Sequence, residues 1–236
     1  MEIIIKIFDV FPAGTQPGID VSHYDGEIDW PTVSHSGVAF AYAKASEGTS
    51  AALLDAFFPA NWSGMKDAGI LRGAYHFFRP ELDASAQAQQ FLAQLANANG
   101  GSSILRAGDL PAVLDLEVID SVAPANIFEG AAIWLETVES ATGRQPILYT
   151  YGNYWREMLG NPQSLSQYPL WFAETGVTTP NIPGGWNNWT IWQFDAQPVA
   201  GISSTAVDLD AFNGSIDDLF SLAGWDFLPF GQLSES

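Results

Sequence analysis

Eight short runs rich in strand-forming residues recur along this chain, and several of them alternate with helical stretches. The runs are 18–22, 38–45, 71–78, 112–118, 146–149, 169–173, 190–194 and 206–209. Residues 54–68, 84–98 and 125–141 lie between some of these runs and carry apolar side chains at three- and four-residue spacing, as amphipathic helices do. Such an alternation of strands and helices predicts a mostly parallel sheet with helices packed outside it.

The number of predicted strands favours closure of this sheet into a barrel. The chain has no glycine-rich nucleotide fingerprint, which disfavours an open doubly wound sheet. Residues 176–188 are rich in Thr, Pro, Gly and Asn and leave too little helical pattern for a full crossover helix between the sixth and seventh strands. We therefore predict an α/β fold, an irregular TIM-like β/α barrel with eight strands and a reduced set of outer helices.

The length of the chain suits a single barrel of this kind. Its 236 residues show neither an internal repeat nor a linker between two domains. We expect an N-terminal extension at residues 1–16, the barrel at 17–217 and a C-terminal tail at 218–236. The tail is too short for a second domain.

The acidic composition limits the partners of this chain. It has 27 acidic and 8 basic residues, and the resulting formal charge of -19 repels phosphate backbones and anionic lipid surfaces at long range. Its apolar runs are all shorter than the roughly 18 residues that a membrane-spanning helix needs. We expect no nucleic acid and no membrane as partner, and we expect a monomer.

The sequence carries no pattern typical of a leader or of a metal site. The opening residues 1–7 are apolar but lack a basic leader, a long hydrophobic stretch and a small-residue cleavage site, so we see no signal peptide. Cysteine is absent, and His23, His35 and His76 do not have the spacing of metal ligands. We expect no metal and no cofactor, and we interpret His76 as a hydrogen-bonded core residue.

Two acids share one face of the predicted strand at 112–118. Alternation places Asp115 and Glu117 on one face and the apolar residues at 114, 116 and 118 on the other, with the two acidic positions roughly 6.6 Å apart along the backbone. Charge pairs usually belong to a solvated surface, but in a hydrophobic strand such a pair is costly unless it serves a site. Burial would keep one carboxyl protonated while the other stays ionised, and glycoside hydrolysis needs that division.

Two further acids occupy comparable positions in distant strands. Asp20 lies at the end of the first run, and Asp208 lies in the last run. If the barrel closes, these two strands become neighbours, and both carboxylates face the same mouth as Asp115 and Glu117. Lys44 follows Phe40 and Tyr42 on a strand whose other face is all alanine, so we expect the lysine in a structural ion pair.

With these residues identified, the chain resembles family 25 of the glycoside hydrolases, the N-acetylmuramidase lysozymes of phages, bacteria and some fungi. The resemblance covers roughly residues 17–217. It is carried by six motifs in the expected order: GIDVS at 18–22, AKASEGT at 43–49, GAYHF at 73–77, LDLE at 114–117, IWQF at 191–194 and VDLD at 207–210. Each motif alone is weak, but together they are specific. The chain departs from the family at Asp210, where members commonly carry Asn.

The resemblance implies an activity and roles for the four acids. The activity is hydrolysis of the β-1,4 bond between N-acetylmuramic acid and N-acetylglucosamine in bacterial peptidoglycan. Glu117 resembles the general acid, which protonates the leaving oxygen and then activates water. Asp115 resembles its partner, either as a nucleophile or as the group that orients the 2-acetamido group of the substrate, and the wide spacing favours the second role with net retention. Asp20 and Asp208 are expected to bind the sugar and to keep Glu117 protonated.

The resemblance also implies the surroundings of the site. Substrate-binding roles fall to side chains near the predicted strand ends, although Glu47 is equally suited to cap a turn: Tyr75, Tyr149, Trp171, Gln193 and Glu47. The expected partner is the glycan strand of peptidoglycan, with no cofactor and no separate wall-binding domain. The expected place of action is the cell wall outside the cytoplasm. Without a signal peptide, the protein is expected to be a phage-released endolysin or a processed secreted protein.

Two other classes of protein remain open at this point. A catalytically inactive barrel that binds wall glycan or chitin as a lectin would keep the aromatic residues, but it has no need for an acid–base pair. Alternatively, the acidic cluster could hold a divalent metal in a hydrolase of another bond, such as an amide or phosphate ester. Activity that survives excess chelator would exclude the second class.

Overall fold

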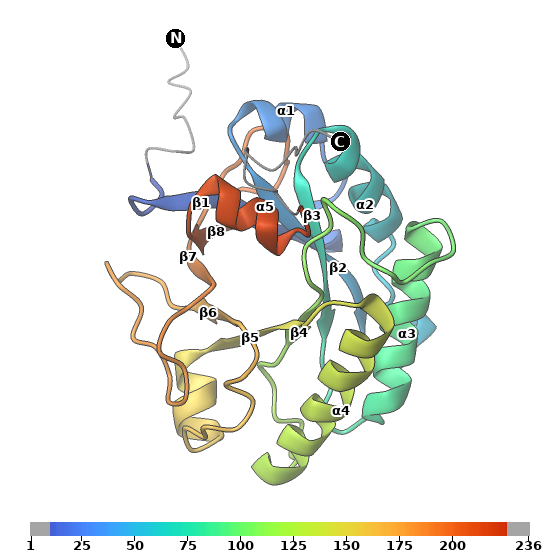
Figure 1. The fold of residues 1–236 in the computed structure, drawn as a ribbon, viewed down its shortest axis with the longest axis vertical. Helices are drawn as coiled ribbons and strands as arrows, with labels where there is room; N and C mark the ends of the chain where they lie inside the picture. The colour runs from blue at the N-terminus through green and yellow to red at the C-terminus, as the bar shows by residue number, and fades with distance from the viewer. Residues whose placement is uncertain (1–9, 226–236) are drawn as a thin grey trace, which may run out of the picture.

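The computed structural model describes residues 10–225 and contains a closed barrel of eight strands in chain order, as Figure 1 shows. The strands are β1 (Thr15–Val21), β2 (Phe40–Glu47), β3 (Leu71–Phe77), β4 (Val113–Asp115), β5 (Ile147–Tyr151), β6 (Leu170–Ala173), β7 (Ile191–Gln197) and β8 (Val207–Asn213). This confirms the predicted β/α barrel. Every predicted strand is present, although the one predicted at 112–118 is much shorter.

Strand β8 is the exception to the parallel arrangement. Neighbouring strands from β1 to β7 are parallel, whereas β8 runs antiparallel to both β7 and β1 and closes the barrel between them. No helix lies in the connection between β7 and β8. A short connection of this kind joins antiparallel neighbours, because a parallel pair needs a long crossover.

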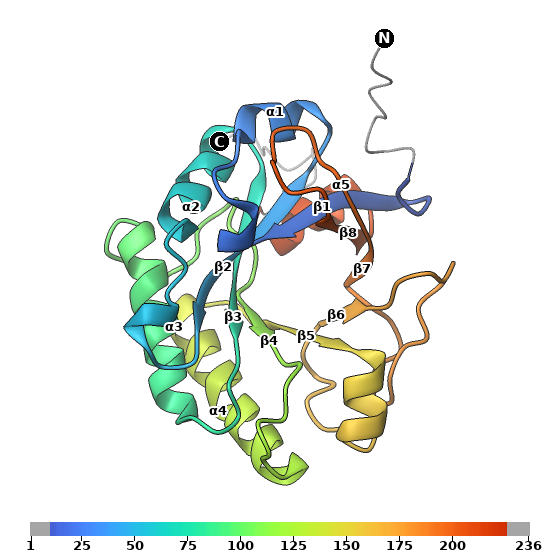
Figure 2. The ribbon, with the colours of Figure 1, turned by 180° about the vertical axis from the view of Figure 1, so that it is seen from behind.

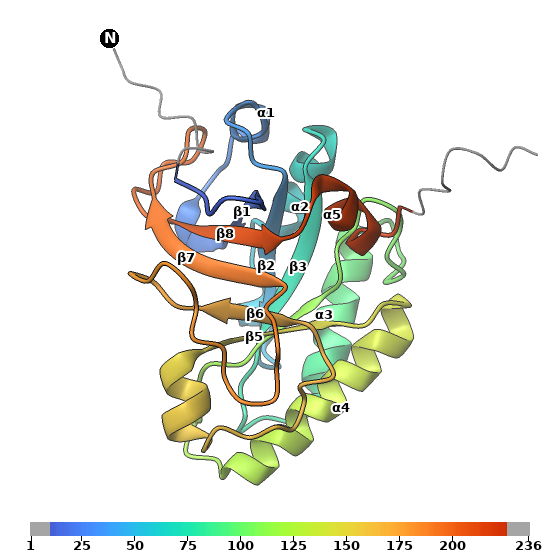
Figure 3. The same ribbon diagram turned by 60° about the vertical axis from the view of Figure 1, so that its left-hand side comes forward.

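The outer helices are unevenly distributed around the barrel. Helices α2 (Phe58–Asp67), α3 (Ala84–Ala98) and α4 (Pro124–Thr142) cover the side formed by β2 to β4, whereas no helix of the described residues covers the outside of β7 and β8 (Figures 2 and 3). The connection after β5 contains only the π-helical segment η4 (Tyr154–Met158), and the connection between β6 and β7 contains no helix. The predicted reduced set of helices is therefore confirmed.

The helix boundaries depart from the prediction in three places. Helix α2 begins four residues later than predicted: a 3-10 segment, η3 (Ala51–Leu53), precedes it, and Pro59 lies in its first turn. Prolines are favoured there, since the first-turn amides have no partner within the helix. Two short helices that the periodicity did not reveal are α1 (Trp30–His35) and α5 (Ile216–Leu222).

Helix α5 also crosses the boundary that we predicted between the barrel and its tail at 217–218. Its residue Leu219 is fully buried and packs with Phe212 at the end of the barrel where β8 finishes. Strand β1 begins at Thr15, two residues before the predicted start of the barrel. Residues 1–9, which include the segment assessed for a leader, and residues 226–236 lie outside the described residues. Within 10–225, no helix is both long and apolar enough to cross a bilayer.

The inside of the barrel is a packed core that forms a floor beneath one end. Tyr42 is fully buried there, its ring centroid 4.8 Å from that of Trp171, and its hydroxyl donates to the Pro111 carbonyl at 3.2 Å. The floor consists of Phe40, Tyr42, Leu71, Val113, Ile147, Trp171, Ile191 and Phe212. On β2 the alanines between these inward residues face the helices, as the strand alternation predicts.

Replacing Gly73 with Ala should destabilise this floor. A Cβ atom at position 73 would overlap the ring of Tyr42 at Cε1 and Cδ1, and that ring is fully buried. Overpacking of this kind costs about 1–3 kcal/mol or more, so we expect a clearly lower melting temperature in thermal unfolding. In a double-mutant cycle with Tyr42→Leu, the two changes together should cost less than the sum of their separate costs. An unchanged melting temperature for Gly73→Ala would contradict this account.

Candidate active site

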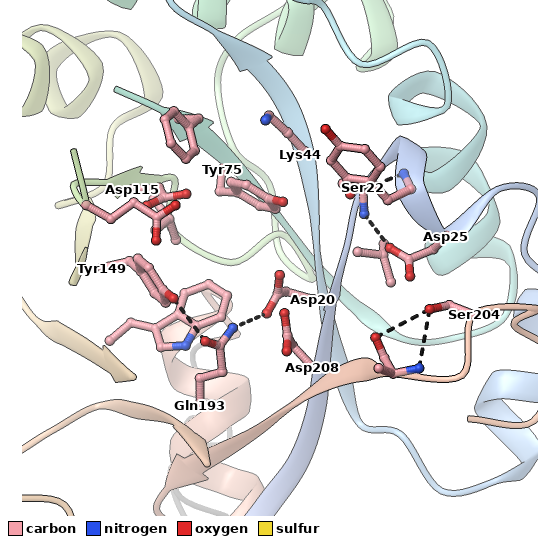
Figure 4. Close-up of a pocket in the computed structure, with 17 residues that line it drawn as sticks. Asp20, Ser22, Asp25, Lys44, Tyr75, Asp115, Tyr149, Gln193, Ser204 and Asp208 are labelled. Carbon is pink, nitrogen blue, oxygen red and sulfur yellow. Dashed lines mark hydrogen bonds between the residues drawn. The ribbon is translucent and has the colours of Figure 1, made fainter. Parts of the chain in front are cut away.

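A cavity of about 350 Å³ opens above this floor, at the end of the barrel where β1 to β7 finish. Carboxylates and aromatic side chains from strands far apart in the sequence point into it, as Figure 4 shows. The predicted site residues in its lining are Asp20, Tyr75, Asp115, Glu117, Tyr149, Trp171, Gln193 and Asp208. The structure thus brings together all four predicted acids.

Asp20 and Asp208 are direct partners across the junction of β1 and β8. Because β8 is antiparallel, Asp208 near its beginning lies beside Asp20 near the end of β1. A parallel β8 would instead carry its beginning to the opposite end of the barrel. The reversed direction of the last strand is therefore what places the fourth acid at the cavity.

Asp115 and Glu117 reach the cavity from the end of β4. The prediction that this strand extends to residue 118 is wrong, because β4 ends at Asp115, and the last bridging bond to β5 runs from the Leu116 amide to the Tyr149 carbonyl at 3.0 Å. The alternation nevertheless continues beyond the strand. Leu116 is buried in the outer core, whereas Asp115 and Glu117 both line the cavity.

Two hydrogen bonds from other segments of the chain hold the loop that carries Glu117. The Tyr154 hydroxyl donates to the Val118 carbonyl at 2.8 Å. Three residues after Glu117, the Asp120 carboxylate accepts from Arg79 at 3.4 Å. These contacts hold the half-buried Glu117 near the mouth of the cavity, above the buried Asp115.

Enclosure and mutual repulsion raise the pKa values of all four acids. Burial, reinforced by Glu117 and Asp20, raises the pKa of Asp115 well above its usual range. Burial also raises the pKa of Glu117, with Lys44 opposing the effect. The pKa of Asp208 rises to about 6, again mainly through burial, and that of Asp20 rises through burial and the nearby Asp208. The site therefore retains protons at a pH where free carboxyl groups have lost them.

A chain of hydrogen bonds fixes Asp20. The Gln193 amide donates from Nε2 to Oδ2 of Asp20 at 2.7 Å, and the Tyr149 hydroxyl donates to Oε1 of Gln193 at 2.9 Å. Trp171 lies edge-on to Tyr149, with ring centroids 5.4 Å apart. These groups hold one ionisable side chain in a fixed orientation along the wall of the cavity.

Of the predicted substrate-binding residues, Glu47 is the one outside the lining. Its carboxylate binds Lys44 at 2.7 Å through one oxygen and Arg79 through the other. The ion pair predicted for Lys44 is thus confirmed, and Lys44 itself lines the cavity. Glu47 links the cation in the cavity to Arg79, which also contacts the loop that carries Glu117.

Several lining residues were missed by the sequence analysis. They include Ser22, Tyr24, Asp25, Phe77 and Ser204. Ser22 and Asp25 form a capping box at η2 (His23–Asp25), and the Ser-x-x-Asp pattern after β1 would have predicted that turn. Tyr24 is 84% exposed and lies over His23, with ring centroids 4.0 Å apart. A single exposed tyrosine in a turn has no sequence pattern that marks it.

The histidines and acids do not gather as metal ligands do. Among residues 10–225, no group of three or more His, Cys, Asp and Glu side chains has the geometry to hold a metal ion. His76 is fully buried and hydrogen-bonded to Ser46 at 2.8 Å and Gln87 at 3.1 Å, which confirms its interpretation as a core residue. Burial lowers the pKa of His76 to about 4, so it is neutral over the range where the carboxyls titrate.

A cavity that combines carboxyl groups of raised pKa with tyrosine, tryptophan and amide side chains at the carboxyl end of a barrel defines a glycoside hydrolase. The family pattern described as Glycosyl hydrolases family 25 matches residues 19–202. The chain belongs to this family, which confirms the resemblance found in the sequence.

Relatives of known sequence and structure agree with this assignment. The chain is 37% identical to Lysozyme M1 of Streptomyces globisporus over 222 residues, covering 90% of this chain and 73% of the relative. It is 33% identical to the N,O-diacetylmuramidase of a Chalaropsis species, covering 89% of this chain and 99% of that protein. The crystal structure of the bacterial lysozyme from Streptomyces coelicolor superimposes with a TM-score of 0.80 at 35% identity, covering 89% and 98% of the two chains.

Proposed function

We propose that this glycoside hydrolase is a muramidase that cleaves the β-1,4 bond between N-acetylmuramic acid and N-acetylglucosamine in peptidoglycan. The single observation that carries the proposal is the meeting of Asp20, Asp115, Glu117 and Asp208 around one cavity. The names of the relatives, a lysozyme and a diacetylmuramidase, support the choice of substrate. The enzyme then acts on the cell wall outside the cytoplasm, with the glycan strand as its partner.

In the first step, Glu117 acts as the general acid. Its carboxyl gives its proton to the glycosidic oxygen while the bond from the anomeric carbon to that oxygen breaks. The carbonyl oxygen of the 2-acetamido group attacks the anomeric carbon from the opposite face and forms a cyclic oxazolinium ion. The N-acetylglucosamine side leaves as the free alcohol.

In the second step, Glu117 acts as the base. It takes a proton from a water molecule, whose oxygen attacks the anomeric carbon and opens the ring of the intermediate. Two inversions give net retention, with N-acetylmuramic acid at the new reducing end. Asp115 orients the acetamido group and stabilises the positive charge that develops on it.

The remaining cavity residues hold the sugar and its charge. Asp20 and Asp208 bind hydroxyl or acetamide groups, and their negative charge stabilises the oxocarbenium-like centre and favours the protonated form of Glu117. Tyr75, Tyr149 and Trp171 offer aromatic faces and edges to the pyranose rings. Gln193 already donates to Asp20, and we assign it a binding role beside that carboxylate.

Digestion of purified peptidoglycan tests the proposal directly. We expect the soluble fragments, after borohydride reduction and mass spectrometry, to carry reduced muramic acid at their new ends, and we expect the same fragments in excess chelator. Reduced glucosamine ends would indicate a glucosaminidase. Freed peptides with intact glycan, or activity lost with chelator, would indicate a hydrolase of another bond.

A further inference from the structure

Beneath the four acids lies a fifth carboxyl group to which the mechanism above assigns no role. Asp210 is fully buried on β8, one inward position deeper than Asp208, and it pairs with Gly18 of β1 and Gln193 of β7. It does not line the cavity. A carboxylate in such a place is costly to keep ionised unless cations or several donors surround it.

The contacts of Asp210 satisfy only one of its oxygens. The Trp171 indole nitrogen donates to Oδ1 at 3.0 Å, whereas Oδ2 is buried and accepts no hydrogen bond from a nitrogen or hydroxyl donor in the described part of the chain. The Asp20 carboxyl is within hydrogen-bonding reach of Asp210. Two ionised carboxylates have no hydrogen to share, so this contact becomes a hydrogen bond only when one of the two holds a proton.

The groups around the pair decide which carboxyl holds that proton. Asp20 accepts from Gln193 at 2.7 Å and reaches the cavity, and both features favour its ionised form. The charged or titratable groups that face Asp210 are Asp20 from β1, Asp208 from β8 and the neutral hydroxyl of Tyr42 from β2, while β6 contributes the indole of Trp171. Burial, with these two neighbouring acids, raises the pKa of Asp210 well above its usual range.

We propose that Asp210 is a positioning residue that keeps its proton in the folded enzyme. Through this proton it donates a hydrogen bond to the Asp20 carboxylate, which is thereby held ionised and correctly oriented beside the substrate. The importance of this contact for catalysis rests on the function proposed above for Asp20. Asp210 touches no substrate. It adds a donor to Asp20 beside the one that Gln193 supplies.

Two substitutions at position 210 distinguish a need for a hydrogen-bond donor from a need for a negative charge. Asp210→Asn keeps the shape, accepts from Trp171 and offers a permanent N–H donor to Asp20, so we expect kcat/KM on peptidoglycan within about threefold of the unaltered enzyme. Asp210→Leu removes both contacts, so the Trp171 indole loses its acceptor and Asp20 keeps only the donor from Gln193, and we expect a loss of at least about tenfold. A variant Asp210→Asn as inactive as Asp210→Leu would overturn the proposal, because it would show that a negative charge is needed there.

Proton uptake on folding supplies a readout that needs no substrate. Above the ordinary aspartate pKa of ~3.9, the unfolded chain has lost the proton of residue 210 while the folded chain keeps it, so folding takes up a proton and weakens as the pH rises. We expect the folding constant of Asp210→Asn to gain about tenfold per pH unit relative to the unaltered protein between about pH 5 and 7. The exposed Asp217→Asn on α5 is the matched control and should not change this slope. An unchanged slope in Asp210→Asn would show that Asp210 is ionised and would refute the proposal even if peptidoglycan is not the substrate.

Discussion

The variant Glu117→Gln should bind peptidoglycan and fail to cleave it. Glutamine has the size of glutamate and preserves hydrogen bonding to the sugar, but it has no proton of suitable acidity for the leaving oxygen. Loss of a general acid lowers the rate by about 10²–10⁴-fold. The release of reducing ends from purified peptidoglycan measures cleavage, and co-sedimentation with the insoluble wall measures binding.

A control separates this effect from a general loss of acidic charge. Glu136→Gln makes the same chemical change on the exposed face of α4, outside the cavity lining, and should leave both measurements unaltered. If Glu117→Gln cleared the wall as fast as the unaltered enzyme, Glu117 would have no acid role. A barrel that only binds glycan would show no clearing even before the substitution, so the two alternatives are distinguishable.

The local sequence pattern predicted which face of the segment carries Glu117, but it did not predict the length of the strand before it. Alternation along residues 113–117 predicts that Asp115 and Glu117 share a face, and both line the cavity even though the strand ends at Asp115. The period of two survives beyond the strand because Leu116 is buried in the core and turns its neighbours the other way. The strand length was not predictable in this way, since it depends on where β3 and β5 stop pairing.

Other features of the site depend on contacts between distant segments. Asp208 reaches the cavity because β8 runs antiparallel, and no local pattern in residues 206–209 records that direction. Glu47 binds a cation in its own strand, Lys44, but its second partner, Arg79, comes from another loop. The cations that this carboxylate binds are brought to it by tertiary packing, which explains why the sequence left substrate binding and turn capping both open for Glu47.

The variant Asp115→Asn should lower kcat by about 10²–10³-fold, the usual cost of removing a group that stabilises developing charge. Asp115 is buried at the end of β4, and one of its oxygens, Oδ1, has no hydrogen-bond partner among residues 10–225. A substrate N–H is a suitable donor for that oxygen. Asn at this position cannot carry the negative charge that balances the oxazolinium ion, so the loss should fall on kcat more than on KM. Asp67→Asn on the exposed end of α2 is the matched control.

Substrate chemistry distinguishes assistance by the acetamido group from attack by Asp115 itself. If the acetamido oxygen is the nucleophile, the unaltered enzyme should fail on peptidoglycan whose muramic acid residues carry a free amine, and chemical re-acetylation of the same polymer should restore cleavage. If Asp115 is the nucleophile, the de-acetylated polymer should still be cleaved, and a glycosyl adduct on the peptide containing Asp115 should appear by mass spectrometry. We expect the first result, because Asp115 keeps a buried oxygen, Oδ1, that has no hydrogen-bond donor among the described residues and is suited to accept from the acetamido N–H.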